Sequence, residues 1–187
     1  MNGEGAIASH IRSRPARLDV FLQPGDWCSG DASYRVRTLL GSCVSVTLWN
    51  PRARVGAMSH SLLPSRGMPA PRDAALDSRY VDEALALMVD GLADLGVTAQ
   101  QCEAKIFGGG DMFGTAHNSI TVGQRNGEAA RVLLRRRGIE VTSESLFGEG
   151  HRQMIFDIAT GEVWARQIPR NAGQAAMPPE IRIGRFA

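Results

Sequence analysis

The stretch LGSCVSVTLWNPRARVGAMSH, residues 40–60, holds the two side chains of this sequence that are best suited to nucleophilic chemistry. Cys43 opens one strand-like run, and His60 lies near the end of the next. A free thiol is mostly protonated at neutral pH, because its pKa is about 8.5. A neighbouring histidine that takes the thiol proton produces a thiolate, which attacks acyl carbons. Cys43 and His60 are therefore a candidate nucleophile and general base.

Residues just before Cys43 would complete such a site. A histidine base usually needs a third group that holds its ring in place. Thr38, at the end of the preceding predicted strand, offers either its hydroxyl or its backbone carbonyl for this. Gly41 and Ser42 allow a tight turn, so that backbone N–H groups near Cys43 face a developing oxyanion.

The same residues also have a purely structural interpretation. A cysteine at the start of a strand commonly serves as a small buried hydrophobic residue. His60 alternates with Met58 and Leu62, as expected for a core histidine whose hydrogen bonds are satisfied. Taken without any further pattern, the residue types favour this structural interpretation.

The spacing of the two residues is compatible with a contact in a β-hairpin. Residues 42–49 and 55–63 are predicted to be strands joined by a turn. A short loop places Cys43 opposite His60, and a loop two residues longer pairs Cys43 with Leu62. His60 is then a diagonal neighbour of Cys43 on the same face. A slip of one residue would send the two side chains to opposite faces.

The remaining pattern predicts an α+β fold. Apolar residues spaced by three and four predict a helix from Val81 to Leu95, with a cap at Asp77 or Ser78 and an end at Gly96. A second helix is expected over residues 127–137, capped by Asn126 and ended by Gly138. Strands are expected over residues 34–38, 42–49, 55–63, 104–109, 139–145, 152–160 and 161–168. Because most strands neighbour another strand in sequence, a doubly wound α/β fold is disfavoured.

Composition excludes several functional classes. The chain has 187 residues, which suits one domain, and a net charge of +2, which is too small to indicate nucleic-acid binding or anionic membranes. No apolar run approaches the length of a membrane span or a signal peptide, so a cytoplasmic protein is expected. Its three cysteines are widely separated, which argues against disulfides and a structural zinc site. No metal or cofactor is predicted.

We expect residues 1–20 to form a flexible extension, residues 21–168 a single domain, and residues 169–187 a flexible tail. The segment 63–73, rich in Pro and Gly, is predicted to be a loop. The glycines of GGGDMFG, from Gly108, lack the phosphate-loop pattern and predict a tight turn beside the candidate site. The arginines at 135–137 are predicted to be a solvated helix end rather than a nucleic-acid contact.

Several blocks of the sequence closely resemble the signature of the CheD family, the chemoreceptor glutamine deamidases of bacterial chemotaxis. The first block is LGSCVSVTLWNPRARVGAMSHSLLP from Leu40, followed by RYVDEAL from Arg79, KIFGGGDMF from Lys105 and VGQRN from Val122. The blocks have family-like order and spacing, and the resemblance covers roughly residues 20–168.

This resemblance implies that Cys43 is the nucleophile, His60 the general base and Thr38 the residue that orients the histidine. The implied reaction hydrolyses the side-chain amide of receptor glutamines to glutamate and releases ammonia through a thioester. The implied substrate is the cytoplasmic helical bundle of methyl-accepting chemotaxis receptors.

The resemblance also implies a fold and a second role. The fold is a layered α/β sandwich of mainly antiparallel sheet with flanking helices, similar to the catalytic domain of cytotoxic necrotising factor toxins. The alternative role is a regulatory docking module that binds a CheC-type chemotaxis phosphatase and stimulates it.

Overall fold

The computed structural model describes residues 17–67, 74–112 and 120–169. Within these ranges the chain forms nine strands, two α-helices and one short 3₁₀ helix. In chain order they are β1 (Leu18–Phe21), β2 (Trp27–Gly30), β3 (Tyr34–Leu40), β4 (Val44–Asn50), β5 (Val55–Ser59), α1 (Val81–Asp94), η1 (Ala99–Gln101), β6 (Glu103–Gly108), α2 (Val122–Arg136), β7 (Glu140–Leu146), β8 (His151–Asp157) and β9 (Glu162–Ile168). The extension predicted at 1–20, most of the loop predicted at 63–73 and the tail predicted at 169–187 lie largely outside the described residues.

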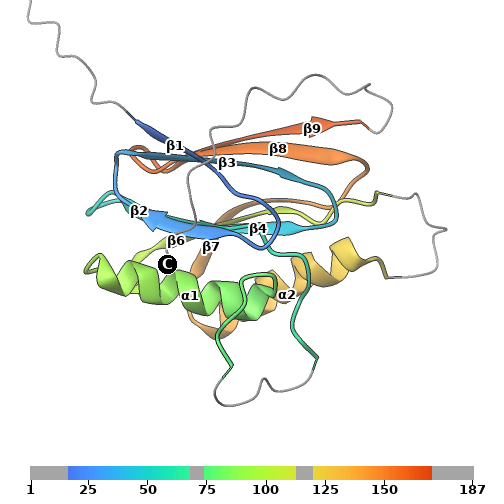
Figure 1. Ribbon diagram of the computed structural model, residues 1–187, viewed down its shortest axis with the longest axis horizontal. Coiled ribbons are helices and arrows are strands. Elements are labelled where there is room, and N and C mark those ends of the chain that lie inside the picture. The colour runs from blue at the N-terminus through green and yellow to red at the C-terminus, as the bar shows by residue number, and fades with distance from the viewer. Residues whose placement is uncertain (1–16, 68–73, 113–119, 170–187) are drawn as a thin grey trace, which may run out of the picture.

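Two sheets and two helices form three layers (Figure 1). The four-stranded sheet has the order β1-β3-β8-β9, and the five-stranded sheet has the order β2-β5-β4-β6-β7. Neighbouring strands are antiparallel except for β1 with β3 and β6 with β7. Both helices pack against the face of the five-stranded sheet that is turned away from the four-stranded sheet. The predicted α+β sandwich of mainly antiparallel sheet is confirmed.

Alternation along β4 divides the core into two layers. Val44, Val46 and Leu48 belong to the cluster beneath the helices, where they are buried together with Leu85 of α1. The opposite face of β4 looks toward the four-stranded sheet, and Cys43, next to the first residue of β4, packs against the apolar cluster between the two sheets. The strand pattern read from the sequence therefore places the candidate nucleophile in the space between the sheets.

The start of α1 differs from the prediction. Its N-cap is Tyr80, and no side chain makes a capping hydrogen bond, so the expected cap at Asp77 or Ser78 was wrong. The Ser78 hydroxyl instead donates to the carbonyl of Gly25. The end was predicted correctly, since Gly96 follows the helix with φ of 77°, a conformation that glycine adopts without strain.

The start of α2 also differs, by five residues. Thr121 caps the helix in a capping box with Gln124, because each side chain accepts a hydrogen bond from the other residue's backbone N–H. Asn126, predicted to be the cap, lies inside the helix and is fully buried. Its side-chain amide instead donates to two backbone carbonyls outside the helix, those of Ser42 and Leu62.

Gly108 is the glycine on which the geometry around Cys43 depends most. Its φ is 106°, and a Cβ at this position would overlap the backbone carbonyl oxygen of Cys43. We expect Gly108→Ala to lower the free energy of unfolding by more than about 2 kcal/mol, because backbone strain and a backbone clash add. Gly138→Ala is the matched control: its φ is also positive, but nothing lies within 4 Å of the added carbon. Urea unfolding that gave equal losses for both variants would contradict this reasoning.

Candidate active site

The hairpin of β4 and β5 places Cys43 and His60 on one face. Val44 and Ser61 exchange two backbone hydrogen bonds of 2.9 and 2.8 Å, which continue the register that begins at the turn. The next position outward sets Cys43 opposite Leu62, so the second of the two predicted registers is the one adopted. His60 is the diagonal neighbour of Cys43, and such diagonal pairs have Cβ atoms about 7 Å apart.

His60 is fixed at both its backbone and its ring. Its backbone N–H donates to the carbonyl of Asp26 and its carbonyl accepts from the N–H of Gly25, both at 2.8 Å. Its side chain is buried, and Nδ1 lies 2.7 Å from Oγ1 of Thr38. Thr38 belongs to β3 of the other sheet, so this contact joins the two sheets. Of the two groups that Thr38 offered, it is the hydroxyl that contacts the histidine.

The hydrogen bonds of Thr38 decide which ring nitrogen of His60 carries the proton. The Thr38 hydroxyl donates its one hydrogen to the carbonyl of Leu22 at 2.8 Å. It must therefore accept from Nδ1–H of His60. Nε2 then holds a lone pair, and it is buried without a hydrogen-bond partner among the described residues. An unprotonated, unpartnered nitrogen is what a general base requires.

Burial keeps both members of the pair neutral at rest. It raises the pKa of the Cys43 thiol above its ordinary value, against a smaller effect of the thiol's own backbone N–H. It lowers the pKa of His60 below 6.5, against the opposing effects of the Leu22 carbonyl and the Asp26 charge. Among the described residues the thiol and Nε2 form no hydrogen bond. In resting enzymes such bonds are often long and tighten when substrate binds. The pair therefore starts as thiol and imidazole rather than as an ion pair.

This starting state predicts the pH dependence of alkylation. We expect the rate at which iodoacetamide modifies Cys43 to rise continuously through neutral pH and beyond pH 9, because the raised pKa keeps the thiolate scarce. Peptide mapping is needed, since Cys28 and Cys102 are also free thiols. Their burial raises their pKa values to about 12 and about 11, which makes them slow internal references. A plateau of Cys43 reactivity below pH 7 would show a preformed thiolate–imidazolium pair instead.

The glycine turn after β6 holds the segment that carries Cys43. The N–H of Gly109 donates to the Cys43 carbonyl at 2.7 Å, and the N–H of Gly110 donates to the Gly41 carbonyl at 2.9 Å. The role predicted for these glycines, a tight turn beside the candidate site, is thus confirmed. Arg152 supports this turn from β8 through a guanidinium donor 3.1 Å from the Gly108 carbonyl.

The sequence did not predict the contacts that two buried polar residues, Arg152 and Asn126, make near the site. Arg152 is buried, and its guanidinium also donates to the Phe147 carbonyl; burial lowers its pKa. Asn126 donates to backbone carbonyls on either side of the Cys43–His60 pair. The block VGQRN, which ends at Asn126, was a signal for this residue, but Asn126 was interpreted as a helix cap. No comparable signal marked Arg152.

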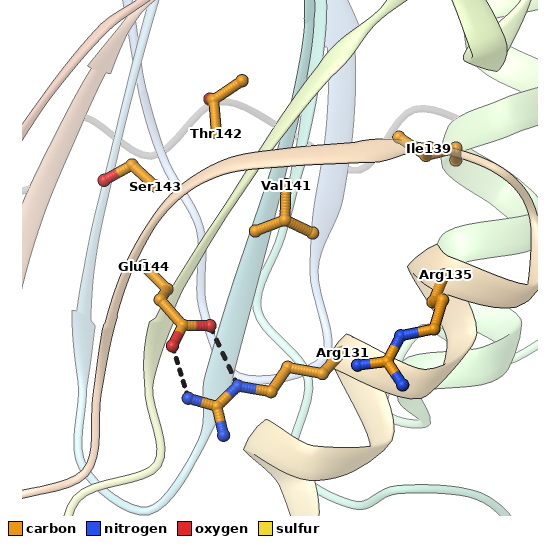
Figure 2. A pocket seen from close by; sticks show the side chains of 7 residues that line it. All are labelled: Arg131, Arg135, Ile139, Val141, Thr142, Ser143 and Glu144. Atoms are coloured by element: carbon orange, nitrogen blue, oxygen red, sulfur yellow. Dashed lines mark hydrogen bonds and ion pairs between the residues drawn. The ribbon is translucent and has the colours of Figure 1, made fainter.

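A pocket lies elsewhere, between α2 and the edge strand β7 (Figure 2). It is lined by Arg131, Arg135, Ile139 and residues 141–144. Figure 2 shows Arg131 turned to the carboxylate of Glu144, with which it forms a bidentate ion pair. None of the residues that line the pocket is a candidate catalytic residue, and the guanidinium of Arg131 is already paired with Glu144. This pocket is therefore separate from the Cys43 site.

Two features are absent from the described residues. Within them, no group of three or more His, Cys, Asp or Glu side chains is placed to hold a metal ion. Neither helix of the described ranges is long and apolar enough to cross a membrane.

Comparison with known proteins identifies the family. The family model described as CheD chemotactic sensory transduction matches residues 62–167, an interval that begins just after His60. A relative from Albidiferax ferrireducens, named probable chemoreceptor glutamine deamidase CheD 2, is 57% identical over 153 residues, which cover 81% of this chain and 88% of that protein. A relative from Chromobacterium violaceum, named probable chemoreceptor glutamine deamidase CheD 1, is 41% identical over 83% of this chain and 80% of its own length. A model match to more than half of the chain and relatives this similar show that the chain belongs to the CheD family.

Proposed function

We propose that this protein is a cysteine hydrolase that converts glutamine side chains of methyl-accepting chemotaxis receptors to glutamate. The names of the relatives support the reaction and the substrate. The observation that carries the assignment to residues is the buried Nε2 of His60, which has a free lone pair on the face that holds Cys43. A core histidine would have both ring nitrogens satisfied.

The first half of the reaction forms a thioester. Nε2 of His60 takes the proton of the Cys43 thiol while the sulfur attacks the amide carbon of the glutamine side chain. The tetrahedral intermediate collapses when the imidazolium returns the proton to the amide nitrogen, which leaves as ammonia. The acyl group is then bound to the sulfur of Cys43, and His60 is neutral again.

The second half releases glutamate. Nε2 of His60 takes a proton from water, whose oxygen attacks the thioester carbon. The carbon–sulfur bond breaks, and the imidazolium returns its proton to the departing thiolate. Thr38 acts through His60 in both halves, because its hydroxyl holds Nδ1–H and so keeps the lone pair on Nε2.

The setting of this activity follows from the proposed substrate. The receptor glutamines lie on the cytoplasmic helical bundle, so the protein works in the cytoplasm on a protein partner. Docking to a CheC-type phosphatase, which the family resemblance implies, stays a prediction.

An assay with a cytoplasmic receptor fragment tests the proposal. The fragment is incubated with purified protein, ammonia is measured, and peptide mass spectrometry locates glutamines that have become glutamates. We expect conversion at a few specific sites together with release of an equal amount of ammonia. A folded protein that converts no glutamine in any receptor fragment of the same organism would contradict the proposal.

Thr38 offers a graded test of the proposed base. We expect Thr38→Val to lower kcat by about 10- to 100-fold. Without the hydroxyl, the buried Nδ1–H has lost its acceptor, which destabilises this tautomer by about 1–3 kcal/mol relative to the one that has its proton on Nε2 and cannot act as the base. Thr38→Ser keeps the hydroxyl and is expected to retain most of the activity. Steady-state kinetics of the two variants measure the difference. Equal activity of the valine and serine variants would remove Thr38 from the mechanism.

A further inference from the structure

Asn126 lies at the end of the β4–β5 hairpin where the backbone hydrogen bonds between its two chain segments stop. Beyond the bonded pair Val44 and Ser61, a regular ladder would continue with the Leu63 N–H donating to the Ser42 carbonyl. The Leu63 N–H donates instead to the carbonyl of Arg79. The Ser42 carbonyl therefore loses its strand partner at the residue that precedes the nucleophile.

The side chain of Asn126 replaces that partner. Its Nδ2 donates to the Ser42 carbonyl at 3.0 Å and to the Leu62 carbonyl at 2.7 Å, so both amide hydrogens are used. Only the nitrogen of the amide can serve two carbonyls, which fixes the orientation of the group. Its Oδ1 is buried without a hydrogen-bond partner among the described residues. An unpaired buried oxygen destabilises the fold. The asparagine is therefore explained by the two hydrogen bonds that its Nδ2 donates.

The Ser42 carbonyl and the Cys43 N–H belong to one peptide unit. In a planar trans peptide these two groups point in opposite directions. The bond from Asn126 therefore turns the N–H of Cys43 away from the helix. Among the described residues this N–H donates to no acceptor except its own thiol, which it approaches closely enough to act on its pKa. The carbonyls of Gly41 and Cys43 are bonded to the glycine turn, so the peptide is held on both sides.

We propose that Asn126 is a positioning residue for an oxyanion hole, in which it fixes the Ser42–Cys43 peptide so that the Cys43 N–H stabilises the tetrahedral intermediate. This inference rests on the proposed cysteine chemistry at the same site. A backbone N–H beside the attacking sulfur lies where charge develops on the substrate oxygen. Because Asn126 acts through the peptide, it needs no contact with the substrate.

Two reagents separate oxyanion stabilisation from general damage to the site. Iodoacetamide alkylates Cys43 by displacement at a saturated carbon, a reaction that forms no oxyanion. The second reagent is a receptor-derived peptide in which an aldehyde replaces the side-chain amide of the glutamine. The Cys43 thiol adds to the carbonyl carbon of this aldehyde. The hemithioacetal that results places its oxygen where the oxyanion of the reaction would lie, so its affinity reports on the hole.

We expect Asn126→Leu to weaken binding of the peptide aldehyde and to lower kcat for deamidation, each by about 10²-fold. The rate of Cys43 alkylation should change far less than aldehyde affinity, because the Cys43 N–H affects the thiol pKa less than burial does. Asn126→Ala, which keeps a strong helix former in α2, serves if the leucine variant is not folded. Asn50→Leu controls for the loss of a buried asparagine, since Asn50 lies at the far end of β4. Its Nδ2 donates to the Gln101 carbonyl, and its Oδ1 accepts from the N–H groups of Arg52 and Ala53. This control variant should leave both aldehyde affinity and kcat unchanged.

The outcomes divide clearly. Unchanged aldehyde affinity in the Asn126 variants, or alkylation that slows in parallel with it, would reduce Asn126 to a structural role and overturn the inference. If the wild type binds the aldehyde tightly and the Asn126 variants do not, the inference holds even when no receptor glutamine is converted. That last result would count against the proposed function alone.

Discussion

Replacing Cys43 by alanine is expected to reduce deamidation of a receptor fragment by at least about 10⁴-fold, because no other group in the site can form the acyl intermediate. The thiol is only partly buried and sits beside β4, so the substitution removes one sulfur atom from the rim of the inter-sheet cluster. Stability should change little. Circular dichroism and urea unfolding establish this before kinetics are compared.

Cys28 provides the matched control for that experiment. It is a free cysteine of β2 that also packs against the inter-sheet cluster, and burial raises its pKa to about 12. Cys28→Ala should retain activity. A Cys43→Ala variant that still converts glutamine at the wild-type rate would exclude nucleophilic catalysis by Cys43. The alanine variant also separates catalysis from docking, since a phosphatase partner that binds this fold should still bind it.

Replacing His60 by glutamine is expected to lower kcat by about 10³-fold, because glutamine fills similar space but has no basic nitrogen. Its amide can still bond to the Thr38 hydroxyl, so the link between the two sheets is kept. The control is His151→Gln, a histidine at the start of β8 that pairs with Ile168 of β9. Loss of activity in both variants to the same extent would point to a general effect of removing histidines rather than to a base at position 60.

The acidic limb of the wild-type pH profile gives an independent test of the same residue. Nε2 accepts a proton only while His60 is neutral, so activity falls as pH drops through the pKa of His60. Burial lowers that pKa below 6.5, and the fall in kcat/KM should therefore occur below pH 6.5. A limb centred above 6.5 would mean that His60 is stabilised as a cation, against the structure.

The sequence predicted the relative placement of Cys43, His60 and Thr38 better than the bounds of the elements around them. Alternation along 43–49 correctly placed Cys43 on the face opposite Val44, because a side-chain period of two is a local property. It left two hairpin registers open, since loop length decides between them, and the bond between Val44 and Ser61 selects one. Thr38 was a candidate because of its place just before Cys43, and the family resemblance implied the same role. No local pattern could show its contact with His60, because that contact joins the two sheets.

Elements whose partners are distant in sequence were the ones missed. Strands β1 and β2 have only four residues each. They are strands because they pair with β3 and β5, which no local sequence pattern shows. The start of α2 was misplaced because Asn126 is a good capping residue by type. Its amide is instead used by carbonyls 64 and 84 positions away, a relation that no local pattern contains.

If the sulfur of Cys43 attacks a glutamine amide, an acyl-enzyme must form, and its detection tests the proposed mechanism directly. Protein and a receptor peptide are mixed, quenched in acid within the first turnover, and analysed by intact mass and peptide mapping. We expect a species heavier than the enzyme by the mass of the peptide less one ammonia, attached at Cys43 and absent from Cys43→Ala. Conversion of glutamine to glutamate with no such adduct at any quench time, and with the alanine variant still active, would contradict the proposed mechanism.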